Sequence, residues 1–167
     1  MKKISAQKGV GLIEILVALL VLAIGILGFV ALQYRAVEAT SEAIHRVQAV
    51  NIARDMAERM RANRHGFLSY KTETSTVANQ TTFTSDCMRN FCSATTLADF
   101  DVAQVTQKAA HLGITVNMLP CAGNNDGRNC LYMAWGDTSA TDGTGAKDCT
   151  NGTAYNSAST CVIMETY

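Results

Sequence analysis

The sequence lacks the motifs that mark common enzymes and metal sites. Its 167 residues contain no Gly-x-Ser-x-Gly and no His-Glu-x-x-His, and the segment Gly143 to Lys147 is too short and wrongly spaced for a phosphate-binding loop. There is also no Cys-x-x-Cys pair, and the three histidines show no ligand spacing to the cysteines. The sequence therefore predicts no catalytic residues, no metal and no cofactor, and we expect a protein that is not an enzyme.

Net charge and proline are also scarce. The chain has one proline, and its 14 basic residues are balanced by 14 acidic ones. Five basic residues gather in the segment 54–65, but Asp55 and Glu58 lie among them, and basic side chains are favoured near the end of a helix by its dipole. We therefore expect no nucleic-acid partner.

One long apolar run dominates the first part of the chain. The 18 residues from Ile15 to Leu32 carry no charged or strongly polar side chain, which is the length of a membrane-spanning helix. Glu14 lies directly before them, and a carboxylate at the edge of a bilayer is costly unless a partner neutralises it. Because Lys2, Lys3 and Lys8 precede it, positive charge favours a cytoplasmic N-terminus. We predict a single-pass helix in which Glu14 is functional; the alternative is a plain anchor.

The helical pattern continues beyond this run. No proline or glycine interrupts residues 29–65, and oppositely charged residues recur at helical spacing, as in Asp55 and Arg59. The sequence predicts one helix from about Val10 to Asn63. At 1.5 Å per residue such a helix is about 80 Å long, more than twice the thickness of the hydrocarbon core of a bilayer. Its outer half therefore has to pack against the rest of the chain.

The residues around Glu14 resemble a known processing signal. Gly9 stands before Val10, the string Leu12-Ile13-Glu14 follows, and the apolar run begins immediately afterwards. Over residues 8–33 this arrangement resembles the class III signal peptide of the type IV pilins and pseudopilins. The resemblance implies that prepilin peptidase cleaves between Gly9 and Val10 and N-methylates Val10, and that Glu14 guides assembly. After cleavage, the α-ammonium of Val10 lies one helical turn before Glu14, or within reach of Glu14 in a neighbouring copy.

The resemblance also implies a domain organisation and a set of partners. Residues 1–9 are a leader peptide, residues 10–34 are the transmembrane and assembly half of the helix, and residues 35–167 are a periplasmic head that includes its outer half. Removal of the leader leaves 11 basic residues against 14 acidic ones. The implied partners are the lipid bilayer, prepilin peptidase, the inner-membrane pilus assembly platform, and other major and minor pilins. The implied location is the bacterial inner membrane before assembly, and the pilus at the cell surface afterwards.

All the cysteines lie in the part predicted to be exported. They are Cys87, Cys92, Cys121, Cys130, Cys149 and Cys161. An even number of cysteines in a small exported domain indicates a disulfide framework. Six cysteines allow fifteen pairings, and we favour the three pairs of sequence neighbours: Cys87 with Cys92, Cys121 with Cys130, and Cys149 with Cys161.

The head is predicted to be of the α+β class. A second helix is expected from Thr96 to His111, capped by Ser93, Thr95 or Thr96. Three strands are expected to form a small antiparallel sheet against the long helix: Ile114 to Leu119, Leu131 to Trp135, and Cys161 to Tyr167. Together with the resemblance, these elements predict a type IV pilin-like fold, with a long, half-transmembrane N-terminal helix, a small sheet, a second short helix and disulfide bonds.

Two polar segments are predicted to be loops. Residues 66–86, rich in Thr, Ser and Asn, are expected to hold at most one weak strand near Thr82 to Thr84. The segment Gly136 to Ser159 is long for a loop in a compact domain, so we interpret it as a functional or mobile loop.

A looser resemblance covers the stretch from Cys87 to Trp135. The strings Cys92-Ser93, Leu97-Ala98-x-Phe100-Asp101, Leu119-Pro120 and Met133-Ala134-Trp135-Gly136-Asp137 resemble the PilV branch of the minor pilins, the pilus modification proteins. This resemblance implies a minor type IV pilin that acts in pilus biogenesis, twitching motility and adhesion. Two alternatives stay open: a minor pseudopilin of a type II secretion system, and a pilus-tip adhesin that binds through the loop Gly136 to Ser159.

Overall fold

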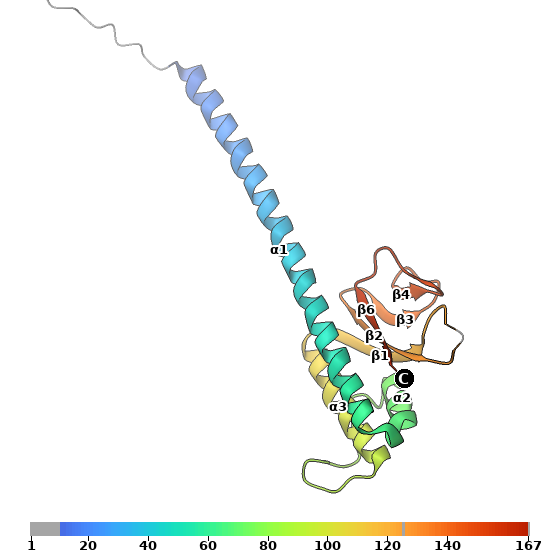
Figure 1. The fold of residues 1–167 in the computed structure, drawn as a ribbon. Coiled ribbons are helices and arrows are strands. Elements are labelled where there is room, and N and C mark those ends of the chain that lie inside the picture. Colours follow the sequence, from blue (N-terminus) through green and yellow to red (C-terminus); the bar gives the residue numbers. More distant parts are fainter. Residues whose placement is uncertain (1–10, 125, 167) are drawn as a thin grey trace, which may run out of the picture. The chain divides into compact units, whose positions relative to one another are not determined.

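The computed structural model describes residues 11–124 and 126–166 (Figure 1). The chain divides into two units, residues 1–42 and residues 43–167. Its elements are α1 (Leu12–Ala62), η1 (Arg64–Gly66), α2 (Phe67–Ser75), α3 (Ala94–His111), β1 (Ile114–Pro120), β2 (Asn129–Trp135), β3 (Ser139–Asp142), β4 (Asp148–Asn151), β5 (Ala154–Tyr155) and β6 (Cys161–Thr166). Gly9 and Val10, the predicted cleavage pair, lie outside the described residues.

The first unit consists, within its described residues, of α1 up to Glu42. The carbonyl oxygen of Gly11 accepts a hydrogen bond from the Glu14 N–H at 2.9 Å, which forms the first turn of the helix. Leu, Ala, Ile and Val then dominate, and a helix satisfies every backbone polar group within its own segment. The predicted long helix is confirmed over the part of the chain that is described.

In the second unit, α3 lies antiparallel to the last turns of α1 (Figure 1). The side-chain amide of Asn63, just after α1, donates to the carbonyl oxygen of Ala94 at the start of α3 at 2.7 Å. Farther along α3, the ammonium of Lys108 lies 3.7 Å from the carboxylate of Asp55. The Ser93 hydroxyl caps α3 by accepting from the Thr96 N–H at 3.2 Å, so the predicted second helix and one of its expected caps are confirmed.

The predicted antiparallel sheet is also confirmed, with strand order β1-β2-β6. The central strand β2 is buried along its whole length, pairing Trp135 with Ile114 on one side and Ala134 with Cys161 on the other. The core joins one face of α1 to α3 and the sheet. Its largest contributors from these elements include Ile52, Met56, Val102, Val105, Met118, Leu131 and Met133.

The prediction of a loop over residues 66–86 is wrong in its first part. Residues Phe67–Ser75 form the helix α2, and Thr82 to Thr84 form no strand. Tyr70 and Thr74, one helical turn apart, are fully buried, so tertiary packing offsets the weak helix propensity of the Thr- and Ser-rich segment. Gly66 allows the close approach before α2, because a Cβ there would lie 2.5 Å from the carbonyl oxygen of Ala94.

The prediction of one long loop over residues 136–159 is wrong as well. Strands β3, β4 and β5 form a second sheet, in which β3 pairs parallel to β4 and β4 pairs antiparallel to β5. Side chains complete the backbone pairing: the carboxylate of Asp142 accepts from the Thr150 hydroxyl at 2.7 Å and from the Gly152 N–H at 2.8 Å. The side-chain amide of Asn117 on β1 donates to the carbonyl oxygen of Ala140 at 2.9 Å, which ties the two sheets together.

All six cysteines form disulfides between sequence neighbours. The bonds join Cys87 to Cys92, Cys121 to Cys130, and Cys149 to Cys161. These are the pairs favoured from the sequence. The third bond links β4 of the small sheet to β6 of the main sheet, and fully buried Cys149 joins a second apolar cluster with Tyr132 and Ala134.

Candidate functional site

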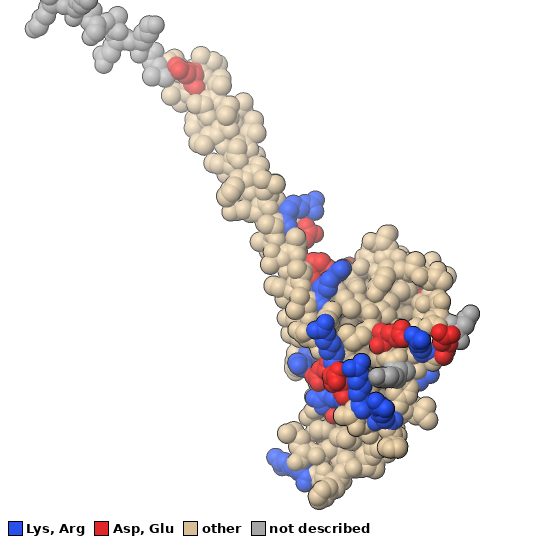
Figure 2. All heavy atoms as spheres, in the orientation of Figure 1, with Lys and Arg blue, Asp and Glu red and all other residues tan. Residues whose placement is uncertain are grey.

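The most prominent surface feature is the apolar side of the first unit. Every described residue from Gly11 to Ser41 is exposed, and large apolar side chains such as Leu20 and Leu27 leave 62% and 69% of their surface uncovered. Figure 2 shows this stretch as almost entirely uncharged. An unbroken apolar surface of this extent marks contact with lipid or with other proteins.

Glu14 is the one charged residue between Leu12 and Tyr34. It lies in the first turn of α1, where the positive end of the helix dipole favours a carboxylate. Its side chain is exposed, so it is accessible to a positively charged group. The two glycines of the apolar run, Gly25 and Gly28, have open space where a Cβ would stand.

By length and composition, α1 is the one described helix suited to crossing a membrane. A buried helix of a water-soluble core and a signal sequence can meet the same criterion. The first of these does not fit here, because none of the apolar window is buried.

In the head, a polar network joins α1, α2 and α3. Asp101, which is only 7% exposed, accepts hydrogen bonds from the guanidinium of Arg59 at 2.5 Å and from the hydroxyl of Tyr70. Arg59 also donates to Asp55 at 2.9 Å and to Gln104 at 3.1 Å. The network therefore fixes the end of α1 against the two helices that follow it.

The network raises the pKa of two of its members. Burial raises the pKa of the Tyr70 hydroxyl, and the hydrogen bond to Asp101 raises it further. For Arg59, burial acts to lower the pKa of the guanidinium, but hydrogen bonds to Asp55 and Asp101 outweigh it and the pKa is raised. Both shifts favour the form already present at neutral pH, as expected of a structural network rather than a proton-transfer site.

The sequence predicted the Asp55–Arg59 pair but not the rest of this network. Asp101 belongs to the Leu97-Ala98-x-Phe100-Asp101 string, where an acid directly after apolar core residues was the available signal. Tyr70 could not be found, because its segment was predicted to be a loop.

The described residues show neither a metal-binding cluster nor a free thiol. None of their His, Cys, Asp and Glu side chains form a group of three or more that could hold a metal ion, and no cysteine is free. A cavity of about 500 Å³ in the head is lined by Ala57, Met60, Arg61, Arg128, Glu165 and Thr166. Its charged groups are engaged in ion pairs: Arg128 lies 2.6 Å from Glu165, and Arg61 lies 2.8 Å from Glu58, which is outside the lining.

Two protein-family models match consecutive parts of the chain. The prokaryotic N-terminal methylation motif matches residues 4–30, and the type IV pilin Tt1218 family matches residues 31–103. No curated protein and no solved structure matches the chain. The first match contains the predicted cleavage and methylation residues and Glu14, and the second contains the outer part of α1, all of α2 and the first half of α3. Over these residues the chain is similar to the type IV pilin family, and its long N-terminal helix, small antiparallel sheet and disulfides form a type IV pilin-like α+β fold.

Proposed function

We propose that this protein is a minor type IV pilin, made as a precursor and incorporated into a pilus or into the complex that primes it. Residues 1–9 are the leader, residues 10–34 span the inner membrane and later pack in the fibre, and residues 35–167 form the periplasmic head. Prepilin peptidase cleaves between Gly9 and Val10 and methylates the new N-terminus. The match to the N-terminal methylation motif over residues 4–30 supports this processing.

The observation that carries the proposal is the exposed apolar surface of α1 from Leu12 to Leu32, with a single carboxylate in its first turn. In the bilayer this surface contacts lipid. In a fibre the same surface contacts the corresponding helices of other pilins, so assembly exchanges one apolar environment for another and is driven by packing and by specific polar contacts.

Glu14 supplies such a polar contact. Cleavage creates an α-ammonium at Val10, and the carboxylate of Glu14 in one subunit binds that ammonium in its neighbour. Because both charges are removed from water, each is stabilised by the other, and loss of one partner leaves an unpaired buried charge that costs free energy. This pairing sets the axial position of one helix against the next.

The proposed role is structural rather than enzymatic, in keeping with the pilin family. The PilV-like strings between Cys92 and Asp137 support assignment to the pilus modification branch of the minor pilins. The inner-membrane assembly platform and the other major and minor pilins are its proposed partners, and pilus biogenesis, twitching motility and adhesion are the proposed processes.

The test compares Glu14→Gln with Glu38→Gln in the producing bacterium. Glu38 is a suitable control because it lies on the same helix and is exposed, with Arg35 at 3.2 Å as its ion-pair partner. We expect Glu14→Gln to be processed and inserted but to be depleted at least about tenfold from sheared pili, and Glu38→Gln to be recovered normally. N-terminal mass spectrometry of the wild-type protein from sheared pili should find methylated Val10.

Normal recovery of the Glu14→Gln protein would contradict the assembly role of this residue. An intact Met1 found only in membrane fractions would contradict the proposed function as a whole. Deletion of the gene distinguishes a pilus component from a secretion component. If the protein is a minor pilin, we expect that pili are lost while protein secretion continues. If it is a pseudopilin, we expect that secretion is lost while pili remain.

A further inference from the structure

A small disulfide-closed loop of the head exposes two large apolar side chains. The disulfide between Cys87 and Cys92 closes it, with the two Cα atoms 5.6 Å apart. Within the loop, the side chain of Phe91 is completely exposed and that of Met88 is 80% exposed. The head has its own apolar core, so these side chains are not needed to build it.

The loop is held in one conformation by its own hydrogen bonds. Asp86 organises it: the side-chain carboxylate accepts from the N–H of Met88 at 3.0 Å, and the main-chain carbonyl accepts from the N–H of Asn90 at 3.0 Å. The side-chain amide of Asn90 donates to the same carbonyl at 3.1 Å. With the disulfide, these contacts fix the backbone on both sides of the exposed side chains.

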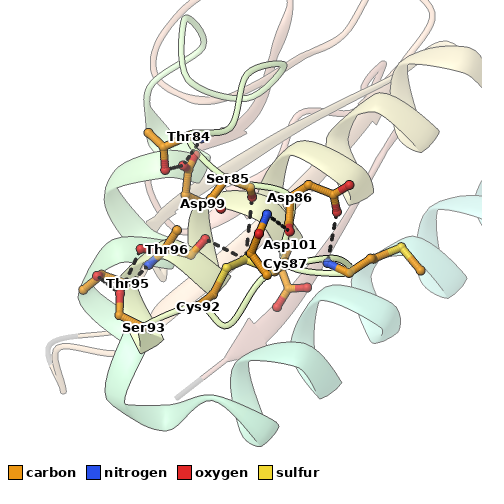
Figure 3. Close-up of a disulfide and its surroundings, with 12 residues drawn as sticks. Thr84, Ser85, Asp86, Cys87, Cys92, Ser93, Thr95, Thr96, Asp99 and Asp101 are labelled. Carbon is orange, nitrogen blue, oxygen red and sulfur yellow. Dashed lines mark hydrogen bonds between the residues drawn. A yellow bond between two sulfur atoms is a disulfide. The ribbon is translucent and has the colours of Figure 1, made fainter.

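Both ends of the loop are fastened to α3. On one side, the N–H and the hydroxyl of Thr84 each donate to the carboxylate of Asp99 at 2.8 Å (Figure 3). On the other side, Ser93 follows Cys92 directly and is the N-cap of α3. The apolar side chains therefore stand on a rigid support, and little conformational entropy is lost when they bind.

The position of the loop in the head and its lack of net charge indicate a protein partner rather than a lipid surface. The loop precedes Ala94, whose carbonyl accepts from Asn63, so it lies at the end of the head where α1 ends. That end is about 30 Å along α1 from Ala43, where the second unit begins. The only charged residues of the loop region 86–92 are Asp86 and Arg89, which lie 3.5 Å apart as an ion pair. A lipid surface is recognised by clusters of basic residues, which this loop does not carry.

We propose that the loop Cys87 to Cys92 is a docking site, at which Phe91, flanked by Met88, inserts into an apolar pocket on the head of a neighbouring pilin. This inference rests on the proposed function, because it names a contact of the same fibre. A single buried aromatic anchor is typical of the residues that dominate binding energy. The loop is far smaller than the roughly 800 Å² that each partner buries in a stable interface. It therefore needs a partner already held nearby, which the adjacent subunit of a fibre is.

The test places a photo-crosslinking phenylalanine analogue at position 91 of the full chain in the producing bacterium. The matched control carries the analogue at Val77, which is 79% exposed and lies outside the loop. We expect light to produce an adduct from position 91, identified by mass spectrometry as another protein with an N-terminal methylation motif, and none from position 77. A lipid adduct, an adduct with a protein that is not a pilin, or no adduct would each overturn the proposal.

A second measurement uses Phe91→Ser, with Val77→Ser as control. We expect Phe91→Ser to lower co-purification with the crosslinked pilin about thirtyfold, as loss of an anchor residue does, while the Cys87–Cys92 disulfide still forms in peptide maps. If the wild-type protein is present in fibres but Phe91→Ser co-purifies equally well, this inference fails and the proposed function stands. If the wild-type protein is absent from fibres, the proposed function fails and the inference with it.

Discussion

Replacement of Asp101 by Asn should measure how strongly the polar network holds the head together. Asp101 is 7% exposed and accepts charge-assisted hydrogen bonds from Arg59 and Tyr70. Each such bond contributes about 1.5–3 kcal/mol. Asn still accepts one of the two, and Arg59 keeps Asp55 at 2.9 Å, so the loss is smaller than that for breaking a fully buried pair. We expect Asp101→Asn to lower the free energy of unfolding by about 2–3 kcal/mol.

The measurement is thermal unfolding of the full chain in detergent, followed by circular dichroism in the near ultraviolet, where Trp135 and the three disulfides of the head contribute. For the second unit, which has 125 residues, the expected loss corresponds to a fall in Tm of about 10 °C. Asp137→Asn is the control, because Asp137 is an exposed residue of the same head. A change in Tm below about 2 °C for Asp101→Asn, or an equal change for Asp137→Asn, would refute the reasoning.

Three further predictions concern pH and the disulfides. Burial and the contact with Asp101 raise the pKa of Tyr70, so the stabilising effect of this residue is complete below about pH 10 and is lost as the pH rises further. In thermal scans at increasing alkaline pH, the Tm of Tyr70→Phe should therefore fall less than that of the wild type. Hydrogen bonds from Thr141 and then from the backbone of Gly145 lower the pKa of Asp148, so the stabilising effect of its carboxylate is present above about pH 4 and is lost as the pH falls through the lowered pKa. The Tm of Asp148→Asn should therefore fall less than that of the wild type between pH 5 and pH 2. Replacing both Cys149 and Cys161 by Ser should lower stability in urea by about 3 kcal/mol, whereas the shorter loop closed by Cys87 and Cys92 should contribute about 2 kcal/mol.

The elements that the sequence predicted correctly are those with a strong local signal. The long helix follows from an apolar run and an absence of proline, and α3 follows from the Ser93 cap, a periodic apolar face and Gly113, whose positive φ of 69° ends it. The strands β1, β2 and β6 carry apolar and β-branched residues between turns. In these segments local preference and tertiary packing agree.

The elements that the sequence missed depend on contacts with distant residues. The helix α2 forms because Tyr70 and Thr74 are buried on the rest of the head and Tyr70 reaches Asp101, more than thirty residues later in the chain. The local sequence does not indicate this contact, and Gly66 before the segment favoured the prediction of a loop.

The second sheet was missed for a related reason. Its strands consist largely of Ser, Thr, Asn and Asp, which have low strand preference apart from Thr and usually indicate turns. Here carboxylates of Asp142 and Asp148 bind neighbouring hydroxyl and N–H groups, and the disulfide to Cys161 fixes the sheet from outside its own segment. The exposed Phe91 was missed because the sequence does not reveal which apolar residues a core leaves out.

The order of the disulfides has a consequence for how the protein matures. The cysteines bond as three consecutive pairs along the chain, with separations of 5, 9 and 12 residues, and no bond crosses another. A polypeptide that enters an oxidising compartment from its N-terminus therefore presents its thiols two at a time in the correct combination. If the head is exported as proposed, an oxidase that joins successive thiols as they arrive produces the native set, and no isomerase is needed to correct wrong bonds.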